Sequence, residues 1–216
     1  WSLLNNVLHF SSQVKSIISF DNFDKKINFE TLNNYFMYSY KNNNNSIFEK
    51  INQVKPGHYV TIDSKKNISV NKYWSLDEHT LKNNFLSNKN EYFEKFDELL
   101  VDATKIRTRS DVPIGSFLSG GIDSSSIAVT LKKRLNLNPT FFTASFENSE
   151  FDESKEAGQI SKLLGCQYQK LLIKPQDCIN IIESIPEYFD EPFADFSAIP
   201  SMAISKMTSE NVKVVL

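Results

Sequence analysis

The second half of the chain alternates between short apolar runs and longer stretches in which apolar residues recur every three or four positions. Short apolar runs predict buried strands, and the wider spacing predicts amphipathic helices. The predicted strands are Pro113–Leu118, Thr140–Phe146, Tyr168–Ile173 and Val212–Leu216, and the predicted helices are Ser124–Leu135, Glu153–Leu164, Asp177–Tyr188 and Ile199–Met207. Strands and helices in this alternation predict an α/β domain, an open parallel sheet with helices on both faces.

A different pattern occupies the first 75 residues, where short strands and turns are predicted with one or two helices. Val7–Phe10 is typical of a strand, and Phe29–Tyr40 has its apolar residues at helical spacing. A turn at residues 55–58 leads into the strand His58–Ile62, and a second turn leads into Ile68–Trp74. This arrangement predicts small hairpins with one or two helices.

The polar segment Ser75–Asn90 separates the two patterns and has no clear period. We interpret residues 76–90 as a linker. From Glu91 onward an amphipathic helix is predicted, because apolar side chains recur three or four positions apart as far as Ile106. The predicted division is therefore residues 1–75, a linker, and a sheet domain at 91–216.

Composition narrows the class of protein. The chain has 216 residues, 40% of them hydrophobic and 23% charged, which excludes a mainly disordered tail. The net charge is −2, so no basic surface predicts binding to nucleic acid or to anionic membranes. No apolar run is long enough to span a membrane, and Cys166 and Cys178 cannot form a disulfide framework. These observations predict a cytoplasmic globular protein.

Both ends of the sequence predict a piece of a longer chain. Trp1 is not a start residue, and Val212–Leu216 is typical of a buried strand in mid-course. A buried strand that lost its following loop would leave backbone groups unpaired.

The strongest chemical signal is Ser-Gly-Gly-Ile-Asp-Ser-Ser-Ser at residues 119–126, between a predicted strand and a predicted helix. Free N–H groups at a helix N-terminus and glycines without a Cβ form an anion site. The candidate phosphate-binding residues are Ser119, Gly120, Gly121, Ser124 and Ser125. Asp123 cannot favour a phosphate directly, so the pattern predicts Mg²⁺ between its carboxylate and the phosphates.

The alternative is that the two glycines make a tight turn and that a serine or aspartate caps the helix. The strand–loop–helix context favours the ligand site. No lysine follows the glycines, and the Gly-x-Gly-x-x-Gly pattern is absent, so γ-phosphate transfer and dinucleotide binding are disfavoured.

The loop resembles the pyrophosphate loop (PP-loop) of N-type ATP pyrophosphatases, which cleave ATP between the α and β phosphates. The wider pattern resembles the asparagine synthetase (glutamine-hydrolysing) family over nearly the whole chain. The segments that carry this resemblance are Asp111–Gly115, Phe151–Ser154, Asp190–Phe193, Ser197–Pro200, Val54–His58 and Tyr73-Trp74.

The resemblance implies a fold and a reaction. Residues 91–216 would be part of an adenine nucleotide α-hydrolase-like sheet domain, and residues 1–75 the end of an α+β N-terminal-nucleophile glutaminase domain. The implied enzyme is a ligase that uses ATP and Mg²⁺ to adenylate aspartate. Ammonia from glutamine then displaces AMP to give asparagine. Small molecules are the implied partners, with neither nucleic acid nor membrane, and a homodimer is the expected assembly.

The resemblance also implies site residues. Phe117 and Ala144 would contact adenine, with plain core packing as the alternative. Asp190, Glu191 and Ser197 would orient an amino-acid substrate, with a solvated turn as the alternative for the acidic pair.

No catalytic residue is expected within the fragment itself. The glutaminase Cys of the family would lie upstream of Trp1, and the second ATP loop would follow Leu216, so the fragment is expected to be inactive. Two other functions stay open at this point. One is an amidotransferase acting on another carboxylate in surface-polysaccharide or β-lactam synthesis, and the other is a catalytically dead nucleotide-binding module.

Overall fold

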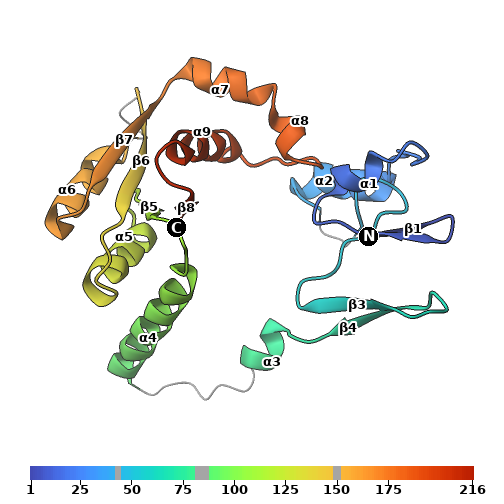
Figure 1. Cartoon of the computed structure of the whole chain (residues 1–216), viewed down its shortest axis with the longest axis horizontal. Helices are drawn as coiled ribbons and strands as arrows, with labels where there is room; N and C mark the ends of the chain where they lie inside the picture. The colour runs from blue at the N-terminus through green and yellow to red at the C-terminus, as the bar shows by residue number, and fades with distance from the viewer. Residues whose placement is uncertain (42–44, 81–87, 148–151) are drawn as a thin grey trace. The chain divides into compact units, whose positions relative to one another are not determined.

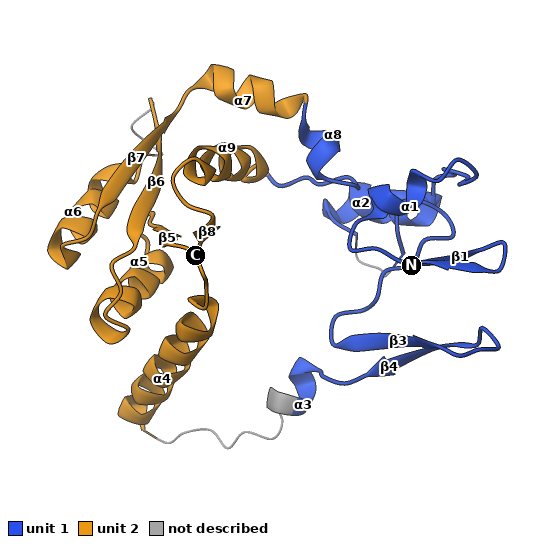
Figure 2. Ribbon diagram, viewed as in Figure 1, with its two compact units in different colours: residues 1–85, 184–195 blue, residues 86–183, 196–216 orange. Residues whose placement is uncertain are grey.

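A computed structural model describes residues 1–41, 45–80, 88–147 and 152–216, without the side chains of residues 79 and 80 (Figure 1). The chain forms two compact units (Figure 2). Unit 1 contains residues 1–85 together with residues 184–195, and unit 2 contains residues 86–183 and 196–216. Each unit is therefore assembled from two separate stretches of sequence.

Unit 2 contains the predicted parallel sheet. Its strands are β5 (Ile114–Phe117), β6 (Thr140–Phe146), β7 (Tyr168–Ile173) and β8 (Val214–Val215). They lie in the order β7-β6-β5-β8, and every neighbouring pair is parallel. The fold class is confirmed, and the bounds of β6 and β7 coincide with the predicted strands. β5 and β8 are shorter than predicted.

Helices cover both faces of this sheet, with α5 and α6 on one side and α7 and α9 on the other (Figure 1). The helices of unit 2 are α4 (Lys89–Arg107), α5 (Ile122–Val129), α6 (Ser154–Leu164), α7 (Pro175–Ile182) and α9 (Ala198–Ser209), and α5 continues into a π-helical turn, η1 (Thr130–Arg134). Within the part of the chain that the structure describes, none of the helices is long and apolar enough to cross a lipid bilayer.

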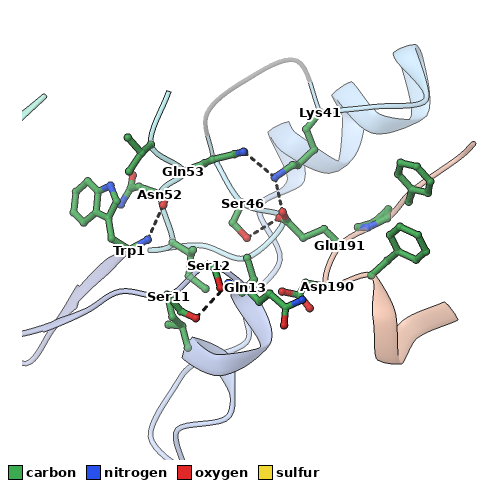
Figure 3. Close-up of a pocket in the computed structure, with 17 residues that line it drawn as sticks. Trp1, Ser11, Ser12, Gln13, Lys41, Ser46, Asn52, Gln53, Asp190 and Glu191 are labelled. Carbon is green, nitrogen blue, oxygen red and sulfur yellow. Dashed lines mark hydrogen bonds and ion pairs between the residues drawn. The ribbon is translucent and has the colours of Figure 1, made fainter. Parts of the chain in front are cut away.

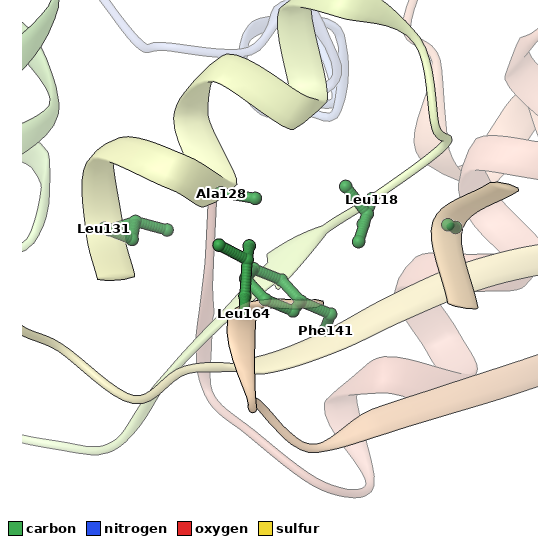
Figure 4. Packing of buried hydrophobic residues seen from close by; sticks show 6 residues of the cluster. Leu118, Ala128, Leu131, Phe141 and Leu164 are labelled. Carbon is green, nitrogen blue, oxygen red and sulfur yellow. The ribbon is translucent and has the colours of Figure 1, made fainter. Parts of the chain in front are cut away.

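The core of unit 2 fixes β5, α5 and α6 relative to one another (Figure 4). Its fully or nearly fully buried members are Leu118, Ala128, Leu131, Phe141, Ala157 and Leu164. Burying a side chain such as Phe141 stabilises the fold by about 2 to 3 kcal/mol. The start of the 119–126 loop and the helix that follows it are therefore attached to the rigid part of the unit.

The predicted single helix Asp177–Tyr188 is wrong, because two helices occupy this stretch. α7 ends at Ile182, and α8 (Ile185–Tyr188) begins after Ser184. Pro186 explains the break: it has no N–H to donate to the Ile182 carbonyl, and its ring would clash with that carbonyl in a continuous helix. The two helices also belong to different units.

Unit 1 is built from small hairpins and short helices, as the sequence predicted. Its elements are β1 (Ser2–Leu4), β2 (Val7–His9), α1 (Val14–Ile18), α2 (Phe29–Tyr38), β3 (His58–Ile62), β4 (Ile68–Lys72), α3 (Leu76–Thr80) and α8. β1 pairs with β2 and β3 with β4, both antiparallel. The buried residues Ile17, Phe23 and Ile51 form a small core.

The expected linker, residues 76–90, spans the first boundary between the two units, which falls after residue 85. α3 occupies its first five residues, α4 begins at Lys89, and residues 81–87 lie outside the described part of the chain.

Candidate functional site

The 119–126 loop starts from a fixed point at the carboxyl end of β5. Leu118 is buried, and its N–H donates to the Phe142 carbonyl at 2.9 Å. The buried hydroxyl of Thr143 donates to the Leu118 carbonyl. Open α/β sheets bind ligands at the carboxyl ends of their strands, and this is where the loop lies.

Two serine hydroxyls close the loop on itself. The Ser119 and Ser124 hydroxyl oxygens are 2.9 Å apart, and the Ser119 N–H donates to Ser124 Oγ at 3.2 Å. Ser119 Oγ also accepts from the Gly121 N–H at 3.3 Å. These exposed hydrogen bonds hold both hydroxyls on the same side of the loop. A bound anion could accept hydrogen bonds from these hydroxyls in place of the bonds between them.

Two features require a glycine at position 120: its backbone conformation and the close contact with α6. Its φ is +88°, a region that L-residues rarely adopt. A Cβ added here would lie 2.7 Å from Glu156 Cβ and 3.2 Å from the Ala157 nitrogen, both on α6. The close approach of α6 to the loop therefore depends on this glycine.

The N-terminus of α5 carries no side-chain cap. Gly121 is the N-cap residue, and within the described part of the chain no side-chain hydrogen bond caps the helix start. One hydroxyl in that turn, Ser125 Oγ, is buried without a hydrogen-bond partner in the described structure. Helix N–H groups and buried hydroxyls are normally satisfied. Uncapped donors beside an unsatisfied hydroxyl are consistent with a site that an anion completes.

Asp123 lies in the same turn of α5 and is exposed. Among the described residues, no lysine or arginine forms an ion pair with it. Nor do those residues include a group of three or more His, Cys, Asp or Glu that could hold a metal. Mg²⁺ is commonly bound by one or two carboxylates together with phosphate oxygens. Asp123 therefore fits an ion that is shared with a bound nucleotide.

The two predicted adenine contacts lie near the carboxyl ends of neighbouring strands. Phe117 ends β5 and Ala144 lies in β6, and both are half-buried. Sequence reasoning missed Ser145, which is 1% exposed and whose hydroxyl has no partner in the described structure. The signal was a serine near the end of an apolar strand. Side chains alternate along a strand, so Ser145 shares the face of the core residue Phe141.

Asp152 precedes α6 and is held in its ionised form. Its Oδ1 accepts from the Ser154 N–H at 3.1 Å, and Lys170 Nζ lies 3.2 Å from its Oδ2. Hydrogen bonding from the Ser154 side chain is the largest cause that lowers the pKa of the Asp152 carboxyl, and Lys170 adds to it. Asp152 therefore fixes the start of α6, the helix that packs on Gly120.

The structure does not bring the three predicted amino-acid contacts together in one unit. Ser197 is the N-cap residue of α9 in unit 2, whereas Asp190 and Glu191 belong to unit 1. Both carboxylates form ion pairs there: Asp190 Oδ1 lies 3.2 Å from Lys15 Nζ, although it has no hydrogen-bond partner among the described residues, and Glu191 pairs with Lys41 (Figure 3). These ion pairs anchor residues 190 and 191 within unit 1.

Comparison with known proteins follows the same division of the chain. The family model for asparagine synthase matches residues 95–216, which is more than half of the sequence. The chain belongs to the asparagine synthase family. A second model, for a glutamine amidotransferase domain, matches residues 1–74. This family uses ATP, so the serine–glycine loop of this family member is a candidate nucleotide site.

Relatives of known description are similar over most of the chain. Asparagine synthetase 1 from Bacillus subtilis (strain 168), described as glutamine-hydrolysing, is 29% identical over 100% of this chain and 33% of its own length. A putative asparagine synthetase from Methanocaldococcus jannaschii is 31% identical over 98% of this chain and 41% of its own. An amidase from Gibberella zeae, chry2, is 27% identical over 82% of this chain and 29% of its own.

Among solved structures, NMN synthetase from Francisella tularensis is similar to 59% of this chain and 53% of its own, with a TM-score of 0.38 and 18% identity. The chain spans about a third to two fifths of the length of the two synthetase relatives.

Proposed function

We propose that this chain is part of a glutamine-dependent amide ligase that converts aspartate to asparagine. In the proposed reaction, ATP transfers AMP to the β-carboxylate of aspartate and releases pyrophosphate. Ammonia from glutamine then attacks the β-aspartyl-AMP carbonyl and AMP leaves. Unit 2 would carry the ATP-dependent step, and unit 1 would be part of the domain that supplies ammonia. The activity belongs to the whole protein.

The observation that supports this proposal is the combination at the N-terminus of α5. Among the described residues, no side chain caps the helix start and Ser125 Oγ is buried without a partner, and Gly120 lets α6 pack directly on the loop. Oriented N–H and hydroxyl donors would stabilise the negative charge that grows on the departing pyrophosphate. A carboxylate is a poor acyl donor, and AMP as the leaving group solves that problem.

The remaining roles follow from position. We propose that Asp123 would hold Mg²⁺, which would neutralise part of the negative charge of the phosphates. Phe117 and Ala144 would border the adenine, and Ser197 would contact the amino-acid substrate. A cytoplasmic location and a homodimer remain expectations, and light scattering of the complete protein tests the second.

The test is product analysis of the complete protein with ATP, Mg²⁺, aspartate and glutamine. The expected products are asparagine, glutamate, AMP and pyrophosphate. Release of ADP and phosphate instead would refute the proposed cleavage of ATP. ATP binding without release of AMP in the presence of any amino acid would support the dead binding module.

A matched pair of serines sharpens this test. Ser125→Ala should lower the rate of pyrophosphate release about 30-fold, because a hydrogen bond to a charged group contributes about 2 kcal/mol. Ser126→Ala is the control, since the Ser126 hydroxyl donates to the Ile122 carbonyl of its own helix at 2.7 Å. Equal effects of the two substitutions would contradict the assignment of Ser125 to the phosphates.

An amidotransferase with another carboxylate substrate is the second candidate, and the similarity to an amidase favours keeping it. The same assay distinguishes the two when aspartate is replaced by a panel of carboxylic acids. Pyrophosphate release that depends on another acid, and not on aspartate, would identify that acid's class as the substrate.

A further inference from the structure

Residues 184–195 are part of unit 1, although they lie in sequence between α7 and α9 of unit 2 (Figure 2). We call residues 184–195 the docking segment. It contains α8 and the acidic pair Asp190 and Glu191.

Glu191 is the main anchor of the docking segment. Its Oε1 accepts from the Ile47 N–H at 2.6 Å and from the Ser46 hydroxyl at 2.8 Å, and its Oε2 pairs with Lys41 (Figure 3). The Lys41 and Glu191 side chains are only 17% and 16% exposed. A carboxylate with a backbone amide, a hydroxyl and an ammonium as partners has few positions left for a substrate.

Asp190 forms a second anchor on a different element. Its Oδ2 accepts from the Lys15 N–H at 3.1 Å, and the Lys15 ammonium lies 3.2 Å from Oδ1. The same ammonium donates to the Glu187 carbonyl within the docking segment. Two adjacent carboxylates therefore hold the start of α1 and the residues near 46, which fixes both the position and the orientation of the segment.

The docking segment also forms one wall of a cavity of about 540 Å³ within unit 1. Phe189 and Phe193 stack there with centroids 4.6 Å apart, and both line the cavity. The opposite walls include Ser11, Gln13 and Gln53 (Figure 3). The shape of this cavity thus depends on the segment staying in place.

Only a few residues of the chain separate this anchor from unit 2. Ser197, at the start of α9, follows Glu191 by six residues. Six residues span at most about 22 Å when fully extended. Residues 183 and 196 are both in unit 2, so the docking segment joins the end of α7 to the start of α9.

From this connection we propose that Asp190 and Glu191, with Lys15 and Lys41, are positioning residues that couple glutamine hydrolysis to amide synthesis. The proposal rests on the proposed function and extends it. With the docking segment anchored, ammonia released on the glutaminase side is used for synthesis. With the segment released, glutamine is still hydrolysed but its ammonia is lost to solvent.

The test uses the complete protein with a Lys41→Gln variant, which removes the ammonium beside Glu191 and leaves the loop residues 119–126 unchanged. Amide synthesis is measured once with saturating ammonium chloride and once with glutamine, and glutamate is counted per amide formed. The expected result is an unchanged rate with ammonia, about a tenfold lower rate with glutamine, and surplus glutamate.

Lys26→Gln is the matched control, because Lys26 forms a surface ion pair with Glu49 at 3.0 Å in the same unit. It should leave the ratio of the two rates as in the parent protein. A second measurement, hydrogen exchange of the Ile47 amide in Lys41→Gln and in the double variant Lys41→Gln/Ser46→Ala, reports directly on release of the Glu191 carboxylate. Faster exchange is expected in both, most in the double variant.

Three outcomes would overturn the coupling role. One is an equal fall of both rates in Lys41→Gln, and another is an unchanged ratio despite faster exchange at Ile47. The third is a Glu191→Gln variant with a raised KM for the carboxylate substrate in the ammonia assay and normal coupling, which would restore a substrate-binding role. If the parent protein makes no amide from ammonia with any carboxylate, the proposed function fails, and this result is distinct from all three.

Discussion

The serine–glycine loop and the docking segment show two ways in which a short polar motif acquires its role. In the loop, the residues that matter are neighbours: Ser119 and Ser124 meet five positions apart, and Gly120 allows the turn between them. In the docking segment, Glu191 finds its partners 144 to 150 residues away in the chain. A local motif can be interpreted from its own sequence, whereas the role of an acidic pair depends on the residues that the fold places beside it.

The largest effect is expected at Gly120, where the loop depends on a backbone conformation. Gly120→Ala places a Cβ 2.7 Å from Glu156 Cβ at a φ of +88°, and we expect about 3 kcal/mol lower stability. Displacement of the loop should lower the rate of pyrophosphate release about 1,000-fold.

Gly165→Ala is the matched control. Gly165 also has a positive φ, +65°, but a Cβ there would meet nothing within 4 Å. Only the strain of about 1 kcal/mol should remain, with activity close to that of the parent. Thermal unfolding and pyrophosphate release check both variants, and similar losses in both would show that the contact with α6 does not matter.

The next effect is expected at Asp123, the carboxylate of the loop without an ion-pair partner among the described residues. Asp123→Asn keeps the shape of the side chain and removes its charge. We expect pyrophosphate release to fall about 100-fold at low Mg²⁺, with partial recovery as Mg²⁺ is raised. Titration of the rate with Mg²⁺ measures this, and an unchanged dependence on Mg²⁺ would exclude the assigned role.

A smaller effect is expected when the docking segment loses its main anchor. Glu191→Ala leaves the mostly buried Lys41 ammonium without its carboxylate, which costs about 2 kcal/mol for a partly exposed pair. Cleavage of residues 184–195 by a protease should then be about tenfold faster in the complete protein. Glu187→Ala is the control, because Glu187 contributes only its backbone carbonyl to Lys15 and its side chain is exposed.

The smallest effects are expected from two aspartates whose pKa values are lowered, Asp152 in unit 2 and Asp63 in unit 1. Hydrogen bonds from Asn67 lower the pKa of Asp63 below 3.8, as those from Ser154 do for Asp152. A lowered folded-state pKa contributes stability above the ordinary pKa, and this contribution is lost as the pH falls through the folded-state pKa. The difference in melting temperature between the parent and Asp152→Asn or Asp63→Asn should therefore shrink from pH 7 to pH 3. A difference that is independent of pH would mean that ionisation plays no part.

The sequence predicted the parts of the fold that depend on local patterns. The sheet, the bounds of β6 and β7, and the position of the loop between β5 and α5 are confirmed. The helix predicted at Asp177–Tyr188 is wrong because apolar spacing outweighed Pro186 in the interpretation, although a proline inside a helix removes a hydrogen bond.

The parts that could not be predicted depend on distant contacts or on burial. Nothing in the letters around Glu191 shows that Ser46 and Ile47 will donate to its carboxylate. Ser145 was missed because a serine in an apolar strand gains meaning only once its hydroxyl is seen to be buried without a partner. The roles assigned to the loop residues stay predictions until the variants are measured.

The two parts of unit 1 lie far apart in the sequence, and this has a consequence for synthesis on the ribosome. Residue 85 leaves the peptidyl-transferase centre about 110 residues before the docking segment is complete. At about 5 to 20 residues per second, the nascent N-terminal unit waits roughly 5 to 20 s for its last piece. During that interval Lys15 and Lys41 lack their carboxylates, and the walls of the cavity that Phe189 and Phe193 later cover are open to solvent or to a chaperone. The order of these segments along the chain thus delays completion of unit 1 until residues 86–183 of unit 2 have been translated.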